Sequence, residues 1–350
     1  ADVRRAQETR RTAIFFGLQT PNPIEDDIGL VEILHTLGVR FMQLTYNNQS
    51  LLAAGCYEAE DSGVTRMGRQ VIREMNRVGL VVDMSHSGDR STLQAIEISE
   101  RPIAITHANP KFWMPAKRNK SDIVPKALAQ SGGMLGFSLY PHHLKDKSAC
   151  TLESFCAMVA ETAELMGVER IGIGSDLCQD QPDSVVEWMR TGRWTKRIDY
   201  GEGSKDAPGF PPMPTWFHDN RDFDAIAGGL RSVGLSADEV AAIMGDNWAR
   251  FFAASFGPAE PARAPLPPPE PVADPARPRS VIDYGLTRRG VLERIRGGDS
   301  FARDEHCDAD PYLLRAARHH GEATERPCPI CKDPELVHVT YVFGDELGPY

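Results

Sequence analysis

The sequence predicts an α/β protein whose main part is a (β/α)8 TIM-type barrel, of which we expect this chain to lack the first two strands. Short apolar runs alternate with amphipathic segments from residue 12 to about residue 176, which is the pattern of parallel βα units. A polar or ionisable residue follows each apolar run, as is typical of the mouth of such a barrel. An open doubly wound sheet is the alternative.

Six apolar runs have the length of strands. The predicted strands are Ala13–Leu18, Val39–Leu44, Leu80–Met84, Pro102–Thr106, Gly133–Leu139 and Arg170–Gly174. The segments between them show the three- and four-residue apolar spacing of helices. The predicted helices are Asp26–Leu37, Thr65–Val78, Asp89–Ser99, Ser121–Gln130 and Leu152–Met166, then Asp224–Val233 and Asp238–Phe252. The first residues, ADVRRAQETRR, read as the end of a helix, so we expect natural sequence upstream of them.

The stretch from Gly79 to Asn119 carries the strongest functional signal. Two successive strands deliver His86 and His107 at their ends, and Ser87 or Asp89 is placed to cap the helix between them. Neighbouring parallel strands end at the same edge, so the two imidazoles should face one cleft. There they are natural metal ligands. A lone histidine is more often a packed side chain, but two at equivalent strand ends favour a site.

The other strands also end in polar residues. In chain order, the strand-end residues are Gln19, Tyr46, His86, His107, the Tyr140/His142/His143 group and Asp176. After them comes an irregular segment, residues 177–222, rich in aromatic side chains, prolines and glycines. A loop of this length is typically a lid, a binding loop or a contact between two copies in a homodimer. Alternatively, its aromatic side chains only pack the loop onto the barrel.

A proline-rich linker precedes a second module. Nine of the 21 residues from Pro258 to Pro278 are proline, which is typical of a polyproline-like spacer. We therefore expect a barrel domain (1–256), a linker (257–279) and a small α+β, zinc-ribbon-like module (280–350). A Cys-x-x-Cys pair with an earlier cysteine and histidine can hold zinc, and free thiols are the alternative. The expected ligands are Cys307, His320, Cys328 and Cys331.

The composition restricts the partners and the compartment. A net charge of −10 argues against nucleic acid or an anionic membrane as the main partner. No apolar window approaches the roughly 18 residues of a membrane span. The seven cysteines are odd in number and scattered, unlike a secreted disulfide framework. We therefore expect reduced thiols, a cytoplasmic protein and a small-molecule substrate.

Six short stretches between residues 13 and 254 form a specific set. They are LHTLGVRFMQLTYNN, GRQVIREMNRVGLVVDMSH, RPIAITHANP, the KRN around Arg118, RIGIGSD and GDNWARFF. In order and spacing they resemble the membrane (renal) dipeptidase family of zinc amidohydrolases. The resemblance implies a (β/α)8 barrel that hydrolyses dipeptides at a two-zinc centre, with His86 and His107 as ligands of the second zinc ion. It also implies that Arg118 pairs with the substrate's carboxylate and that Asp176 handles the proton given to the leaving amine.

The chain departs from the family's pattern at three points. No His-x-Asp motif precedes Gln19, although that motif supplies ligands for the first zinc ion in the family. Gln19 itself stands where the family has a glutamate that bridges both metals, and a neutral amide bridges two dications poorly. Tyr46 replaces a histidine on the substrate side. We therefore expect the barrel to bind zinc weakly, or at one position only.

The last stretches of the chain carry a second resemblance. CDADPYLLRAARHHGEATERPCPIC and VTYVFGDELGP resemble a small uncharacterised actinobacterial family, which implies an actinobacterial source but no activity. We favour a zinc-dependent hydrolase that cleaves a dipeptide or a similar small amide with a free carboxylate. The alternatives are a catalytically impaired barrel that binds a small carboxylate through Arg118, and a scaffold whose C-terminal module recruits a protein partner.

Overall fold

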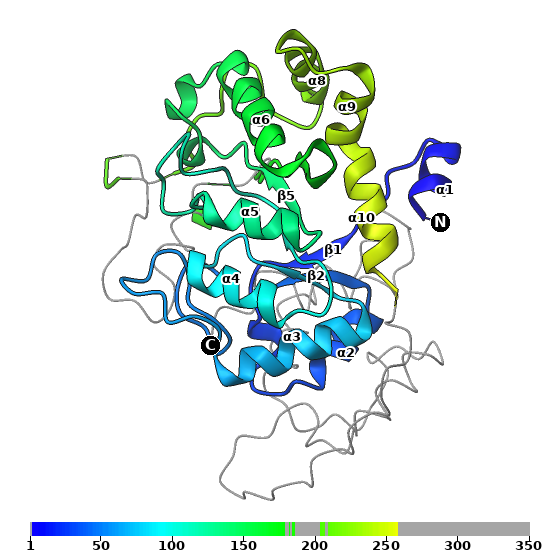
Figure 1. Ribbon diagram of the computed structural model, residues 1–350, viewed down its shortest axis with the longest axis vertical. Coiled ribbons are helices and arrows are strands. Elements are labelled where there is room, and N and C mark those ends of the chain that lie inside the picture. Colours follow the sequence, from blue (N-terminus) through cyan, green and yellow to red (C-terminus); the bar gives the residue numbers. More distant parts are fainter. Residues whose placement is uncertain (1, 179–181, 183, 186–203, 207–208, 258–350) are drawn as a thin grey trace, which may run out of the picture. The chain divides into compact units, whose positions relative to one another are not determined.

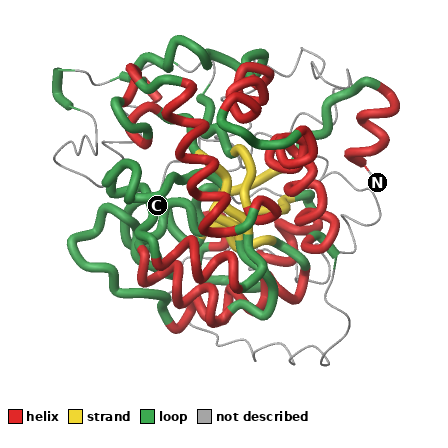
Figure 2. Tube along the Cα trace, turned by 45° about the horizontal axis from the view of Figure 1, so that its top comes forward, coloured by secondary structure: helices red, strands yellow, loops and turns green. Residues whose placement is uncertain are grey.

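Six parallel strands in sequential order form the central sheet. The computed structural model describes residues 2–178, 182, 184–185, 204–206 and 209–257, and all of these belong to one compact unit. The strands are β1 (Phe16–Leu18), β2 (Val39–Gln43), β3 (Val81–Asp83), β4 (Ala104–Ile105), β5 (Met134–Phe137) and β6 (Ile171–Ile173). Each strand pairs with the next one along the chain. Figure 2 shows the strands gathered among the helices.

Helices connect the strands in the predicted alternation (Figure 1). Their bounds are α1 (Asp2–Thr9), α2 (Leu30–Thr36), α3 (Arg66–Val78), α4 (Asp89–Ile98), α5 (Ile123–Gln130), α6 (Leu152–Met166), α8 (Phe223–Ser232), α9 (Ala237–Ala241) and α10 (Asn247–Ser255). Among the described helices, none combines the length and the apolar character needed to cross a bilayer.

The connecting helices α2 to α6 all pack on one face of the sheet. Strand residues Met42, Val82, Ile105 and Leu135 share one buried core with apolar side chains from each of these five helices. A doubly wound sheet would place helices on both faces and would reverse its strand order at a switch point. The sequential order, with the connecting helices on a single face, therefore confirms the predicted barrel-type fold.

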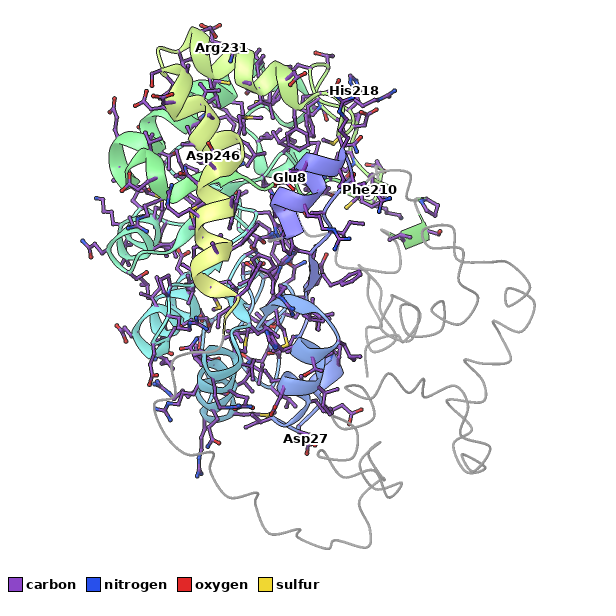
Figure 3. All side chains as sticks on the ribbon, turned by 90° about the vertical axis from the view of Figure 1, so that its right-hand side faces the viewer. Glu8, Asp27, Phe210, His218, Arg231 and Asp246 are labelled. Carbon is purple, nitrogen blue, oxygen red and sulfur yellow. The ribbon has the colours of Figure 1, made fainter. Side chains whose placement is uncertain are left out.

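Helix α10 packs against the opposite, inner face of the sheet. Val81, Ala104 and Met134, one from each of three neighbouring strands, form a second cluster with Phe251. The Trp248 ring lies so close to β6 that a Cβ on Gly172 would come within 2.5 Å of its Nε1. Only glycine allows this approach. Figure 3 labels Asp246 at the start of α10.

The fourth strand is shorter than the predicted Pro102–Thr106. Pro102 has no N–H to donate, and the N–H of Thr106 donates to Oδ1 of Asp83 (3.1 Å). The strand ladder therefore ends at Ile105, and the chain turns towards the strand-end site directly after it.

Two predicted helix features are wrong. The N-cap of α4 is Gly88, not Ser87 or Asp89, and the carboxylate of Asp61 instead accepts hydrogen bonds from the N–H and the hydroxyl of Ser91. The helix predicted at Asp238–Phe252 is interrupted. It passes through a π-helical segment, Ala242–Asp246, in which Gly245 has a φ of 174° and leaves the helical conformation.

Several predicted features lie outside the described residues. These are the linker, the C-terminal module with Cys307, His320, Cys328 and Cys331, and part of the long loop. The described end of that loop packs on the barrel, since Phe217 is buried and Trp216 Nε1 donates to the carbonyl of Cys150 (2.8 Å). The four cysteines of the described part are free thiols.

Candidate active site

Two buried histidines meet at the carboxyl ends of β3 and β4. The side chains of His86 and His107 come from residues only 4% and 6% exposed, and their Nε2 atoms lie 3.0 Å apart. Two imidazole ligands about 2.05 Å from one tetrahedral zinc ion would have nitrogen atoms about 3.3 Å apart. The pair therefore has nearly the separation of two ligands of the same metal ion.

Both imidazoles are held through Nδ1. His86 Nδ1 donates to Oδ1 of Asn47 (2.7 Å), and the ring stacks on Tyr46 with centroids 4.1 Å apart. His107 Nδ1 is 2.8 Å from Oγ1 of Thr106. An imidazole whose Nδ1 is engaged in this way presents Nε2 to a metal. The paired Nε2 atoms thus offer two ligands to a metal ion, while in the described residues no group of three or more histidine, cysteine, aspartate or glutamate side chains is arranged to hold one.

Burial keeps both histidines neutral. Burial lowers the pKa of His86 well below its usual value, and the positive charge of Arg118 lowers it further. Burial also lowers the pKa of His107, although the carboxylate of Asp176 opposes this effect. Neutral imidazole is the form that binds metals.

Asp176 completes the group from beyond β6. Its carboxylate lies 3.8 Å from His107 Nε2 and 4.0 Å from His143 Nδ1. The backbone of Asp176 has a φ of 54°, a left-handed conformation that is uncommon for a residue other than glycine and that clusters at functional sites. The predicted convergence of His86, His107 and Asp176 is what the structure shows.

Arg118 lies beneath this group as a buried cation. The residue is 2% exposed, and its guanidinium donates to the carbonyls of Ser85 and of His107. These two carbonyls belong to the chain segments that carry the histidines. Arg118 therefore ties the two strand ends together, a role that the sequence did not indicate.

Lys120 is a second buried cation on the same segment. Its Nζ donates to the carbonyls of Met84 (2.9 Å) and Ser87 (2.5 Å), on either side of His86. Burial lowers the pKa of Lys120 to about 8. The ammonium satisfies backbone carbonyls that the short strand β3 leaves without a ladder partner.

Tyr46 and Gln19 differ in how they reach the site. The Tyr46 ring stacks on His86, and partial burial together with the negative charge of Asp176 raises the pKa of its hydroxyl. Gln19 follows β1 directly, but its side chain is exposed. Among the described residues, no hydrogen bond joins Gln19 to either histidine. The structure thus places Tyr46 at the site and leaves the Gln19 side chain exposed, without a hydrogen bond to the pair.

A cavity of about 230 Å³ lies beside Asp176. Leu177, Phe210 and Met213 supply apolar walls, and His218 adds a polar group. Figure 3 labels Phe210 and His218 on the same side of the barrel. The cavity offers a small molecule a position next to the carboxylate.

His143 from the predicted Tyr140/His142/His143 group is buried next to Asp176, with Nδ1 2.8 Å from Ser138 Oγ. Burial lowers the pKa of His143 well below its usual value, and the positive charge of Arg118 lowers it further. Below the unfolded pKa of about 6.5, the unfolded chain binds a proton at this histidine and the folded chain does not. The free energy of unfolding is therefore unaffected above that pH and decreases as the pH falls below it.

Replacing His143 with glutamine, which can keep the hydrogen bond to Ser138, should remove this acid sensitivity. We expect the difference in unfolding free energy between wild type and His143→Gln to shift in favour of the variant by up to about 1.4 kcal/mol between pH 6.5 and 5.5. Urea unfolding at both pH values measures it. Parallel pH profiles for the two proteins would contradict the expectation.

Sequence reasoning missed the residues that orient the histidines. Asn47 and Thr106 contact the two Nδ1 atoms, and Asp83 accepts a hydrogen bond from Thr106. One signal was available, because Asp83 is a charged residue inside an apolar strand, LVVDM. Buried carboxylates in such a position require hydrogen-bond partners.

Comparison with known proteins identifies the family of this chain. The sequence pattern of the membrane dipeptidase family, peptidase family M19, matches residues 1–189. The chain belongs to this family. Residues 276–350 match a separate family of unknown function, in agreement with the second resemblance noted in the sequence.

The curated relatives of this chain include fungal dipeptidases. Dipeptidase verJ of Clonostachys rogersoniana is 31% identical over 180 residues, which cover 50% of this chain and 46% of that protein. Dipeptidase tcpJ of Claviceps purpurea is 29% identical over 178 residues, 50% of this chain and 42% of that protein. The chain thus spans less than half the length of these two relatives.

Two solved structures share the fold of this chain. An amidohydrolase from Pseudomonas aeruginosa is 31% identical, with a TM-score of 0.68, covering 73% of this chain and 76% of that one. A metallo peptidase from Rhodobacter sphaeroides, solved with a phosphinate mimic of L-Ala-D-Ala, is 18% identical, with a TM-score of 0.59 over 72% of this chain and 66% of that one. This second likeness shows the fold alone.

Proposed function

We propose that this chain is a metal-dependent hydrolase of the dipeptidase family, acting on a dipeptide or a similar small amide with a free carboxylate. One observation carries the proposal: two buried, neutral imidazoles present Nε2 atoms 3.0 Å apart, with each Nδ1 engaged by an oxygen. A bound zinc ion supplies a Lewis acid and lowers the pKa of its water towards neutrality.

The chain's own residues have three further roles in this proposal. The Asp176 carboxylate, which stands beside the histidine pair and the cavity, takes the proton released by the attacking water and passes it to the leaving amine. The Arg118 guanidinium, next to both histidines, favours a substrate carboxylate. The Tyr46 ring, which stacks on His86, forms one wall of the proposed substrate site.

We propose a single zinc ion at the histidine pair. A catalytic zinc site usually has three protein ligands, and in the described part the pair provides two. The amide of Gln19 cannot replace a bridging carboxylate. The barrel should therefore bind zinc more weakly than a complete two-metal site. Zinc in the C-terminal module, with Cys307, His320, Cys328 and Cys331 as ligands, is a separate proposal that rests on the sequence.

Hydrolysis of a dipeptide panel by the full chain tests the proposed function. The Cys328→Ser/Cys331→Ser variant serves as background, so that any zinc bound by these thiols is removed from the comparison. We expect turnover with added zinc, loss of turnover with a chelator and recovery when zinc is restored. Absence of turnover across the panel in the zinc-loaded protein would refute the proposal.

A second candidate is a non-catalytic barrel that binds a small carboxylate. It is favoured by Gln19, a neutral amide where the family has a glutamate. In that case dipeptides should bind in calorimetry with equal affinity before and after chelation, and no product should form. Binding that requires zinc would exclude this candidate.

A further inference from the structure

A buried carboxylate lies one layer below the histidine pair. Asp83 ends strand β3 and is 3% exposed. None of the ion pairs in the described part of the chain involves it. A carboxylate buried without a cationic partner is costly unless several hydrogen bonds satisfy it. Asp83 therefore requires several hydrogen-bond donors around its carboxylate.

Five donors converge on this carboxylate. Oδ1 accepts from the N–H of Ser85 (3.0 Å), the hydroxyl of Ser85 (2.5 Å) and the N–H of Thr106 (3.1 Å). Oδ2 accepts from Nε2 of Gln43 (3.2 Å) and from the hydroxyl of Thr106 (2.6 Å). All five partners donate, which is the environment of an ionised, acceptor-only carboxylate.

The Thr106 hydroxyl connects the Asp83 carboxylate to the ring of His107. A hydroxyl has one proton, and Thr106 donates it to Asp83. Towards His107 Nδ1, at 2.8 Å, the Thr106 oxygen can then only accept. His107 therefore carries its proton on Nδ1, and its Nε2, like that of His86, presents a lone pair to the position between the two rings.

We infer that Asp83, acting through Thr106, is the positioning residue that fixes the tautomer of His107 and so makes its Nε2 a metal ligand. A second connection supports the same role: the Ser85 hydroxyl donates to Asp83 and accepts from the N–H of His107 (3.1 Å). Asp83 thus joins the two strand ends that carry the histidines. Only the metal-binding consequence of this inference rests on the proposed function.

The hydrogen bonds from His107 Nδ1 to Thr106 and from Thr106 to Asp83 form a relay. The substitution Asp83→Asn should reverse the direction of both hydrogen bonds. Two backbone N–H groups point at Oδ1 and cannot become acceptors, so the new amide nitrogen must take the place of Oδ2. Gln43 can accommodate it by turning its amide, because its buried Oε1 has no hydrogen-bond partner in the structure. Thr106 then accepts from the amide and donates to His107 Nδ1, and the proton of His107 moves to Nε2.

Nitrogen NMR of the metal-free full chain, labelled with 15N-histidine, tests the inference. The His107 signal is assigned by its loss in His107→Gln. We expect Nδ1–H in the wild type and in Thr106→Ser, Nε2–H in Asp83→Asn, and no fixed tautomer in Thr106→Val. Gln43→Met is the matched control, because it removes a donor to the same carboxylate but leaves the relay intact, and it should resemble the wild type.

Zinc affinity provides the second measurement, on the Cys328→Ser/Cys331→Ser background. We expect it to fall about 10- to 100-fold in Asp83→Asn and in Thr106→Val, and to change less than about threefold in Thr106→Ser and Gln43→Met. A wild-type His107 protonated on Nε2, or an unchanged tautomer in Asp83→Asn, would overturn the inference. If Asp83→Asn does not fold, identical tautomers in Thr106→Ser and Thr106→Val would overturn it. If the tautomers are as expected but the protein binds no zinc, the proposed function is refuted and the inference about Asp83 is upheld.

Discussion

Replacing His107 with glutamine is expected to lower the zinc affinity of the barrel more than about 100-fold. Removing a hydrogen-bond partner of a metal ligand already lowers metal affinity about 10- to 100-fold. His107 is itself a proposed ligand, one of the two imidazoles that meet at 3.0 Å. His86→Gln should have the same effect, and the double variant should lose little more, because one remaining imidazole cannot hold the ion. Competition with a chromophoric chelator measures the affinity.

His35→Gln is the matched control for this prediction. His35 lies on α2, away from the strand ends, and its replacement should leave zinc affinity within about twofold. Zinc binding that survives in both His86→Gln and His107→Gln would show that the ion is bound elsewhere, and would contradict the assignment of the site.

Replacing Arg118 is expected to affect both stability and substrate selection. Arg118→Met leaves the carbonyls of Ser85 and His107 without their buried donor. Each unsatisfied buried group costs about 1–3 kcal/mol, so the loss of donors to two carbonyls should lower the unfolding free energy by about 2–6 kcal/mol. Urea unfolding measures this loss.

Arg118→Lys tests substrate selection with the charge retained. Lysine lacks the planar fork that binds a carboxylate through two hydrogen bonds, so the preference of the enzyme for a dipeptide over its C-terminal amide should decrease about 10- to 100-fold. Loss of folding cannot mimic this result, because the preference is a ratio of two rates in the same protein. An unchanged ratio would show that Arg118 serves only the backbone carbonyls.

The strand positions and the main site could be predicted because each depends on local sequence. Apolar runs place the strands, and a parallel sheet brings their ends to one edge, so His86, His107 and Asp176 converge as expected. The family resemblance supplied the roles of these residues, and the comparison with known proteins confirms the family.

The features that escaped prediction depend on contacts between distant segments. Asp61 caps α4 from an earlier loop. Arg118 and Lys120 serve backbone carbonyls that only the fold brings near them. The short β4 results from one N–H that turns to Asp83. The periodicity of apolar residues does not predict which side chains from distant segments form hydrogen bonds with one another. A lone aspartate in an apolar strand, such as Asp83, does indicate a buried hydrogen-bond network.

X-ray absorption at the zinc edge of the full chain, loaded with zinc on the Cys328→Ser/Cys331→Ser background, tests the central assignment most directly. We expect two imidazole nitrogen ligands at about 2.0–2.1 Å, and loss of that imidazole signal in His107→Gln. A spectrum without histidine scattering, or one that His86→Gln and His107→Gln leave unchanged, would contradict it.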